Sequence, residues 1–218
     1  MAEAAAQRRG HPGLSFSYDM LGEGARTDGD ARRHLEAYRQ AIAAIAGGRV
    51  AASPHEADGI SIKLSALFAR FEDAQRERVF AELLPRVWQL VEPAARANIN
   101  LTIDAEECDR LELSLELFEA LAARIATHCP QWAGFGLAVQ AYQTRALAVV
   151  DEIAAIAERH DLRTLRWLKS QLDAGLSISR AVDYLQELRS MGSDPADSPA
   201  GAHSAALAPA PGAAAGLA

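Results

Sequence analysis

The sequence is poor in cysteine and has no long apolar run free of charge. Cys108 and Cys129 are the only cysteines among 218 residues, and their spacing does not resemble that of a metal site. We expect two reduced thiols and no metal centre. No uncharged apolar run approaches the roughly 18 residues of a transmembrane helix. No apolar segment follows Arg8 and Arg9, so we predict no signal peptide.

Positive charge is also scarce. The chain has 22 lysines and arginines against 29 acidic residues, a net charge of −7, which argues against a protein that coats nucleic acid. Half of the residues are hydrophobic and 23% are charged, which excludes a wholly disordered chain. No Gly-x-Gly-x-x-Gly motif follows a predicted strand, which disfavours a dinucleotide-binding Rossmann fold.

What the sequence does have is a repeated alternation of short apolar strands and longer amphipathic helices. Three of the predicted strands carry apolar residues on both faces, as strands covered on both sides do. Such alternation predicts a parallel sheet, either doubly wound or part of a (βα)8 barrel. The predicted strands are 14–21, 59–67, 99–104 and 135–140, and the predicted helices are about 28–46, 74–97, 109–126 and 144–160.

Polar residues stand where the predicted strands end, which is where such folds carry their function. Asp104 could be a general base, a ribose or flavin ligand, or a helix cap. Glu106 and Glu107 read as a solvated helix start. Gln140 can both donate and accept, which suits the edge of a heterocycle or an ordinary loop hydrogen bond.

Lys63 is the most unusual of these residues, because only one other lysine, Lys169, occurs in the chain. It lies inside the apolar run 59–67, where an ammonium needs an anion to offset its loss of hydration. That anion could be a protein carboxylate such as Asp104, in a structural ion pair. It could equally be the carboxylate of a substrate.

Four motifs follow one another along the predicted strands, and they are Phe16–Glu23, Gly59–Leu67, Leu101–Glu107 and Val139–Gln143. Taken together, these motifs resemble the proline dehydrogenase domain of the bifunctional bacterial proline-utilisation flavoenzymes, over about residues 14–162. The resemblance implies the N-terminal half, four βα units, of an α/β (βα)8 barrel that holds FAD. It also implies oxidation of L-proline to pyrroline-5-carboxylate in proline catabolism, with a quinone as electron acceptor.

The resemblance also implies roles for particular residues. Lys63 would pair with the proline carboxylate, a task that suits a lysine point charge. Asp104 would be the active-site aspartate beside the substrate and the flavin. The backbone of Ile103 would contact the flavin ring, as would Val139 and Gln140.

The sequence departs from this pattern after residue 162. The family's fifth strand, with its Arg and Lys-Gly, does not follow, and neither do the late Tyr and the paired arginines. We therefore predict a truncated enzyme, with its activity alone in question. The alternative is an inactive half-barrel fusion, or a regulatory or interaction module.

We expect a cytoplasmic location, or a peripheral one at the inner membrane face. We also expect exposed sheet edges that could support self-association.

The two ends of the chain differ from its middle. Residues 1–13 are small and polar, and we predict a disordered terminus. Residues 163–191 predict a short helical hairpin, of which 165–182 resembles the later helices of MerR-type regulators. The net charge of residues 163–191 is only +2, from five basic and three acidic residues, so we do not expect DNA as a partner. Residues 192–218, rich in Ala, Pro and Gly, predict a disordered tail.

Overall fold

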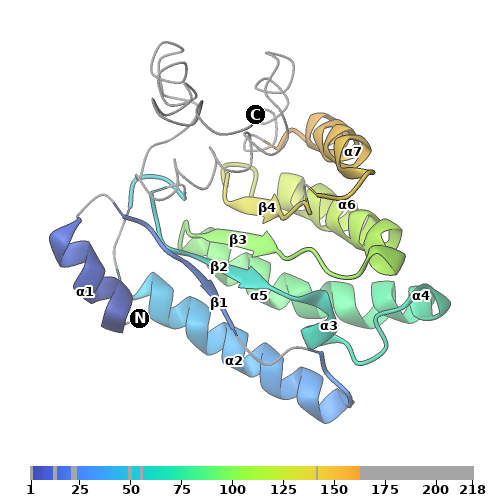
Figure 1. Cartoon of the computed structure of the whole chain (residues 1–218), viewed down its shortest axis with the longest axis horizontal. Coiled ribbons are helices and arrows are strands. Elements are labelled where there is room, and N and C mark those ends of the chain that lie inside the picture. Colours follow the sequence, from blue (N-terminus) through green and yellow to red (C-terminus); the bar gives the residue numbers. More distant parts are fainter. Residues whose placement is uncertain are drawn as a thin grey trace, which may run out of the picture.

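A computed structural model describes residues 2–11, 14–20, 24–48, 51–54, 56–140 and 142–162. The predicted hairpin at 163–191 and the predicted tail at 192–218 lie outside the described residues. The described chain folds into one four-stranded sheet with the order β1-β2-β3-β4 (Figure 1). All neighbouring strands are parallel, so the predicted α/β class and the four βα units are confirmed.

The elements follow one another in the predicted alternation, with short helical turns added. The strands are β1 (Ser17–Asp19), β2 (Gly59–Ile62), β3 (Asn100–Ile103) and β4 (Phe135–Leu137). The main helices are α1 (Ala2–Gly10), α2 (Asp28–Ala46), α5 (Leu84–Arg96), α6 (Leu111–His128) and α7 (Ala146–Arg159). The short helical pieces are α3 (Leu64–Leu67), η1 (Asp73–Gln75), α4 (Arg76–Arg78), η2 (Val79–Leu83) and η3 (Cys108–Arg110).

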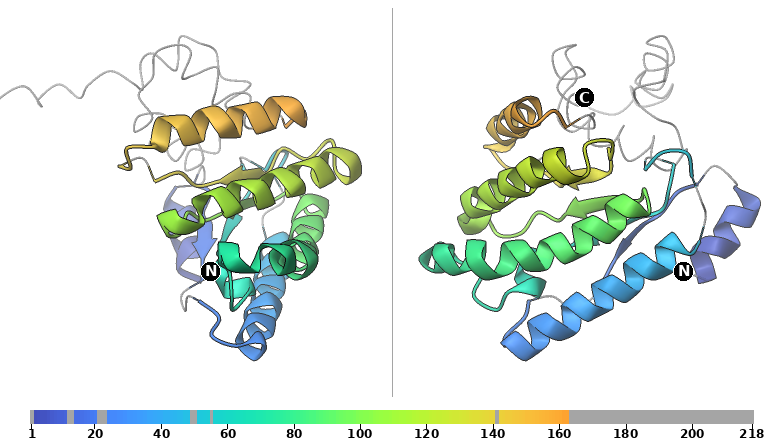
Figure 2. Two further views of the ribbon diagram at one scale, coloured as in Figure 1. Left: turned by 90° about the vertical axis from the view of Figure 1, so that its right-hand side faces the viewer. Right: turned by 180° about the vertical axis from the view of Figure 1, so that it is seen from behind.

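The two faces of the sheet differ in chemistry. The row Ile60–Leu101–Phe135 faces the helices, and these side chains are almost fully buried in one core. Figure 2 shows α2, α5 and α6 covering that face. The next row, Asp19–Ser61–Thr102, points to the opposite face and is polar. The expectation of apolar residues on both faces is therefore wrong for these strands, and in the run 59–67 it also counted the helical residues 64–67 as strand.

Helix α2 begins after a capping residue, Thr27, and ends before a glycine, Gly47. The Thr27 side chain accepts the backbone N–H of Asp30, and the Asp30 carboxylate accepts the N–H of Thr27, which completes a capping box. Gly47 follows the last helical residue. The face that α2 presents to the sheet carries the buried residues Ala31, Tyr38, Ile42 and Ile45.

The predicted helix at 74–97 contains a π turn at η2. The Leu84 N–H reaches back to the carbonyl of Val79, five residues earlier. Pro85 follows and has no N–H to donate to the preceding turn, which accounts for the irregular bonding at this point. The helix continues as α5, and its buried side packs into the core through Val87, Leu90, Val91 and Ala94.

The prediction of a disordered N-terminus is wrong for the described residues, because residues 2–10 form α1. Arg8 of this helix pairs with Asp58, which is 8% exposed and stands just before β2. Asp58 also accepts the N–H of Phe16 at 3.0 Å and the Tyr18 hydroxyl at 3.4 Å. These bonds tie α1 to the amino-terminal end of the sheet (Figure 1).

The strand predicted at 59–67 ends early. β2 stops at Ile62, and the next apolar residues turn into α3. Lys63 therefore stands immediately after the strand rather than in its middle. No helix within the described ranges is long and apolar enough to cross a membrane.

Candidate functional site

Three charged side chains meet at the carboxyl edge of the sheet. The Lys63 ammonium lies 2.8 Å from a carboxylate oxygen of Asp104 and 3.4 Å from one of Asp19. The three residues follow or end strands β2, β3 and β1, so the parallel topology brings them together. The Lys63 side chain is only 9% exposed, and the carboxylates offset the cost of burying its charge.

Asp104 is held by the sheet and by the loop after β3. Its backbone N–H donates to the carbonyl of Ile62 at 2.9 Å, one step beyond the paired residues Ile62 and Ile103. Its second carboxylate oxygen accepts the Ala105 N–H at 3.0 Å. The helix-cap alternative for Asp104 is wrong, because Glu107 precedes η3 and makes no side-chain cap bond.

The backbone of Lys63 is held from the helix layer. Its N–H donates to the Tyr38 hydroxyl at 3.2 Å. Tyr38 is 2% exposed, and burial raises the pKa of its hydroxyl above the ordinary value, although Lys63 acts in the opposite direction. Tyr38 therefore remains a neutral hydroxyl at neutral pH.

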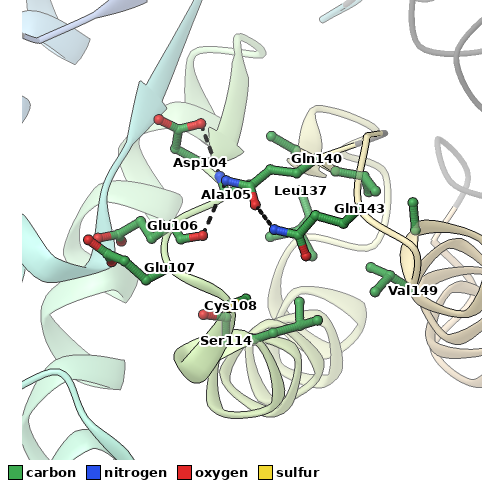
Figure 3. Close-up of a pocket in the computed structure, with 14 residues that line it drawn as sticks. Asp104, Ala105, Glu106, Glu107, Cys108, Ser114, Leu137, Gln140, Gln143 and Val149 are labelled. Atoms are coloured by element: carbon green, nitrogen blue, oxygen red, sulfur yellow. Dashed lines mark hydrogen bonds between the residues drawn. The ribbon is translucent and has the colours of Figure 1, made fainter.

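A second group of side chains lies between the loops after β3 and β4. The Gln140 amide donates to the backbone oxygen of Glu106 at 3.2 Å and accepts the side-chain N–H of Gln143 (Figure 3). The Glu106 carboxylate accepts the N–H of Ser65 at 3.1 Å. Glu106 thus connects the loops after β2, β3 and β4, and it does not act as the solvated helix start that its sequence position predicted.

The other predicted flavin contacts lie close by. Ile103 is fully buried in the core, and its carbonyl accepts the Ala138 N–H at 2.9 Å. Only its backbone is therefore near the edge of the sheet. Val139 is half-buried and lines a hollow between α6 and α7 with Leu137 and Val149.

Two adjoining hollows join these groups into one candidate site. The first has an apolar side formed by Leu111, Leu137, Val139 and Val149, and a polar side formed by residues 104–107. The second, broader hollow includes Lys63, Ser65, Asp104 and Gln140. Within the described ranges, no group of three His, Cys, Asp or Glu residues could hold a metal ion.

Sequence reasoning brought out Lys63, Asp104, Val139 and Gln140, and the fold places all four around these hollows. It missed Tyr38, which reads as one more apolar position of α2. A signal was present, since the polar hydroxyl of a tyrosine on a buried helix face needs a hydrogen-bond partner. Glu106 gave no comparable signal, because both of its bonds reach other loops.

Comparison with known proteins gives the family. The family model described as proline dehydrogenase matches residues 2–167, and so includes α1. The bifunctional protein PutA of Escherichia coli (strain K12) is 43% identical over 167 residues, which is 76% of this chain. The PutA protein of Rhizobium meliloti is 46% identical over 153 residues, or 70% of this chain. The matched region spans only 12% of either relative.

Solved structures agree with this match. A crystal structure of bifunctional proline utilization A superimposes with a TM-score of 0.62 at 49% identity, over 68% of this chain and 15% of that chain. The protein of that name from Bdellovibrio bacteriovorus, inactivated by N-propargylglycine, gives 0.63 at 20% identity, over 73% of this chain and 17% of that chain, and shows the shared fold alone. The chain therefore belongs to the proline dehydrogenase family, and its matched part corresponds to the proline dehydrogenase domain of PutA-type enzymes.

Proposed function

We propose that this chain carries the site of an FAD-dependent proline dehydrogenase, which oxidises L-proline to pyrroline-5-carboxylate. The observation that supports this most is the gathering of Lys63, Asp104 and Gln140 around adjoining hollows in a chain of this family. The reaction removes a hydride from the ring CH2 carbon that is bonded to the proline nitrogen, and a proton from that nitrogen. A C=N bond is left between the two atoms.

The charges at the site suit an amino acid zwitterion. Lys63 would receive the proline carboxylate, while Asp104 and Asp19 would face the ring ammonium. Because Lys63 is already surrounded by two carboxylates, the incoming carboxylate must share the ammonium with Asp104. The positive end of proline offsets the resulting negative charge.

The first hollow has the chemistry that a flavin ring needs. Its apolar side, with Leu137, Val139 and Val149, can pack against a flat aromatic face. Its polar side carries the Gln140 amide, which can donate and accept at a heterocycle edge. The flavin, when bound there, supplies the acceptor for the hydride, and the protein supplies binding and orientation.

The electrons would pass on to a membrane quinone, and the protein would be cytoplasmic or peripheral at the inner face of the membrane. β1 and β4 are the outer strands of the described sheet, and self-association through them is part of the proposal.

The test uses the full chain, purified and refolded with and without FAD. We expect a yellow protein whose flavin absorbance is bleached by L-proline without oxygen, and not by D-proline. A chain that takes up no flavin, or a bound flavin that L-proline leaves oxidised, would overturn the proposal. Either result would favour the alternative of an inactive half-barrel or interaction module.

A further inference from the structure

Helix α2 holds the turn that carries Lys63 at two points. The Tyr38 hydroxyl accepts the N–H of Lys63 at 3.2 Å, and the His34 ring donates from Nδ1 to the carbonyl of Ala66 at 3.2 Å. Tyr38 and His34 are four residues apart and so lie one above the other on the same face of the helix. The two side chains therefore hold the turn at its first residue, Lys63, and at its fourth residue, Ala66.

The N–H of Lys63 is the point at which strand β2 ends. The β2–β3 ladder stops with the bond from the Asp104 N–H to Ile62. The same peptide, which joins Ile62 to Lys63, directs its N–H to the helix layer, where it donates to the Tyr38 hydroxyl. This bond accompanies the change from extended backbone to α3, for which Lys63 stands at the N-cap position.

Tyr38 is a rigid support for this bond. Its ring is 2% exposed and belongs to the core, and α2 has a complete capping box at its start. Loss of the hydroxyl would leave the buried N–H of Lys63 without this acceptor, which favours a rotation of that peptide. A small rotation there moves the far end of a long lysine side chain by a larger distance.

We propose that Tyr38 is a positioning residue, whose hydroxyl fixes the backbone of Lys63 so that the ammonium reaches Asp104 and Asp19 at once. Its effect on the ion pair stands on the contacts just described. Its effect on proline binding rests on the proposed function.

The test compares Y38F with two matched controls. Y18F removes a tyrosine hydroxyl that bonds Asp58 at the other end of the sheet. I42V weakens the core on the same face of α2 without removing a polar group. The measurement is the acetylation of Lys63 by acetic anhydride in the folded chain, relative to that of Lys169, read by mass spectrometry. The chain has only these two lysines, so the ratio is simple to measure.

We expect Y38F to raise the ratio of Lys63 to Lys169 acetylation about fivefold, the scale of one lost hydrogen bond. We expect Y18F and I42V to leave it unchanged. A ratio that Y38F does not move, or that I42V moves equally, would overturn the proposal, since the second result is what a merely structural role produces. If Y38F does not fold, amide exchange at Lys63 in the unaltered chain decides: slow exchange supports the proposal and solvent-like exchange overturns it.

L-proline separates this inference from the proposed function. If both hold, L-proline protects Lys63 from acetylation, and Y38F needs about fivefold more proline for the same protection. If L-proline protects neither protein while the ratio still rises in Y38F, the proposed function fails and the positioning role stands.

Discussion

The ammonium of Lys63 lies 2.8 Å from a carboxylate oxygen of Asp104, and these residues directly follow the paired strand residues Ile62 and Ile103. The ion pair is therefore a product of strand register. Each partner is the first residue beyond its strand, at the same level of the sheet. A slip of one residue in this pairing would move the two charges apart.

Replacement of Lys63 by alanine should weaken proline binding and leave the cofactor in place. Loss of one charged hydrogen bond to the substrate predicts a tenfold to hundredfold rise, to order of magnitude, in the proline concentration for half-maximal flavin reduction. Flavin content, measured by absorbance of the purified chain, should not change. Loss of flavin in this variant would show that Lys63 serves the cofactor instead.

Replacement of Asp104 by asparagine should slow flavin reduction and destabilise the fold. Lys63 would lose its 2.8 Å ion pair and keep the longer contact to Asp19, at 3.4 Å. We expect the free energy of unfolding in urea to fall by about 1–3 kcal/mol. D109N, at an exposed position five residues later, is the control and should behave like the unaltered chain.

Replacement of Gln143 by alanine should loosen the Gln140 amide. Gln143 donates to that amide, which in turn donates to Glu106 (Figure 3). The dissociation constant for FAD, from fluorescence titration, should rise about threefold to tenfold. Q40A removes an exposed glutamine on α2 that donates to the nearby Glu36, and should not alter the dissociation constant. Equal affinities in Q143A and the unaltered chain would count against the flavin contact assigned to Gln140.

Acid should loosen the packing of α7 on α6 through Glu119. Its hydrogen bond from Arg159, helped by His160, holds the pKa of the Glu119 carboxyl below its ordinary value. A lowered pKa in the folded state means that the stabilisation is present above the ordinary value and is lost as the pH falls towards the lowered one. The melting temperature of E119Q should therefore lie below that of the parent at neutral pH and converge with it in acid. E77Q, at an exposed position, should show no such convergence.

Replacement of Gly134 by alanine should destabilise the start of β4. A Cβ at this position would overlap the Trp132 indole nitrogen and lie 2.6 Å from the carbonyl oxygen of Ile99. These two groups bond each other at 3.0 Å across the glycine. We expect a loss of about 1–3 kcal/mol in denaturant unfolding. G10A, where a Cβ meets nothing within 4 Å, should cost little.

The regular part of this fold could be predicted from the sequence because its signals are local. The cap at Thr27 and the stop at Gly47 set α2, and the apolar periodicity set the four βα units. The prediction of one strand over 59–67 was wrong for its second half, because a short apolar segment suits a strand and a buried helix equally well. Only the fold shows that Leu64–Leu67 turn into α3.

The candidate site was predictable to the extent that strand ends meet at one edge of a parallel sheet. That rule brought Lys63, Asp104 and Gln140 together, and the contact of Lys63 with Asp104 was one of two partners considered. Tyr38 and Glu106 escaped prediction because their bonds join segments 25 and 41 residues apart. No local pattern carries such a pairing.

The bond of Arg8 to Asp58 has a practical consequence for anyone who shortens this chain. A recombinant protein begun at Leu14, the boundary that the sequence pattern suggested, would lose Arg8 and keep Asp58, whose side chain is 11% exposed. Among the described residues, the N–H of Phe16 and the Tyr18 hydroxyl would then be left to offset the charge of the carboxylate. Low yield or aggregation of such a shortened protein would reflect the cut, and an affinity tag is better placed ahead of α1 than in place of it.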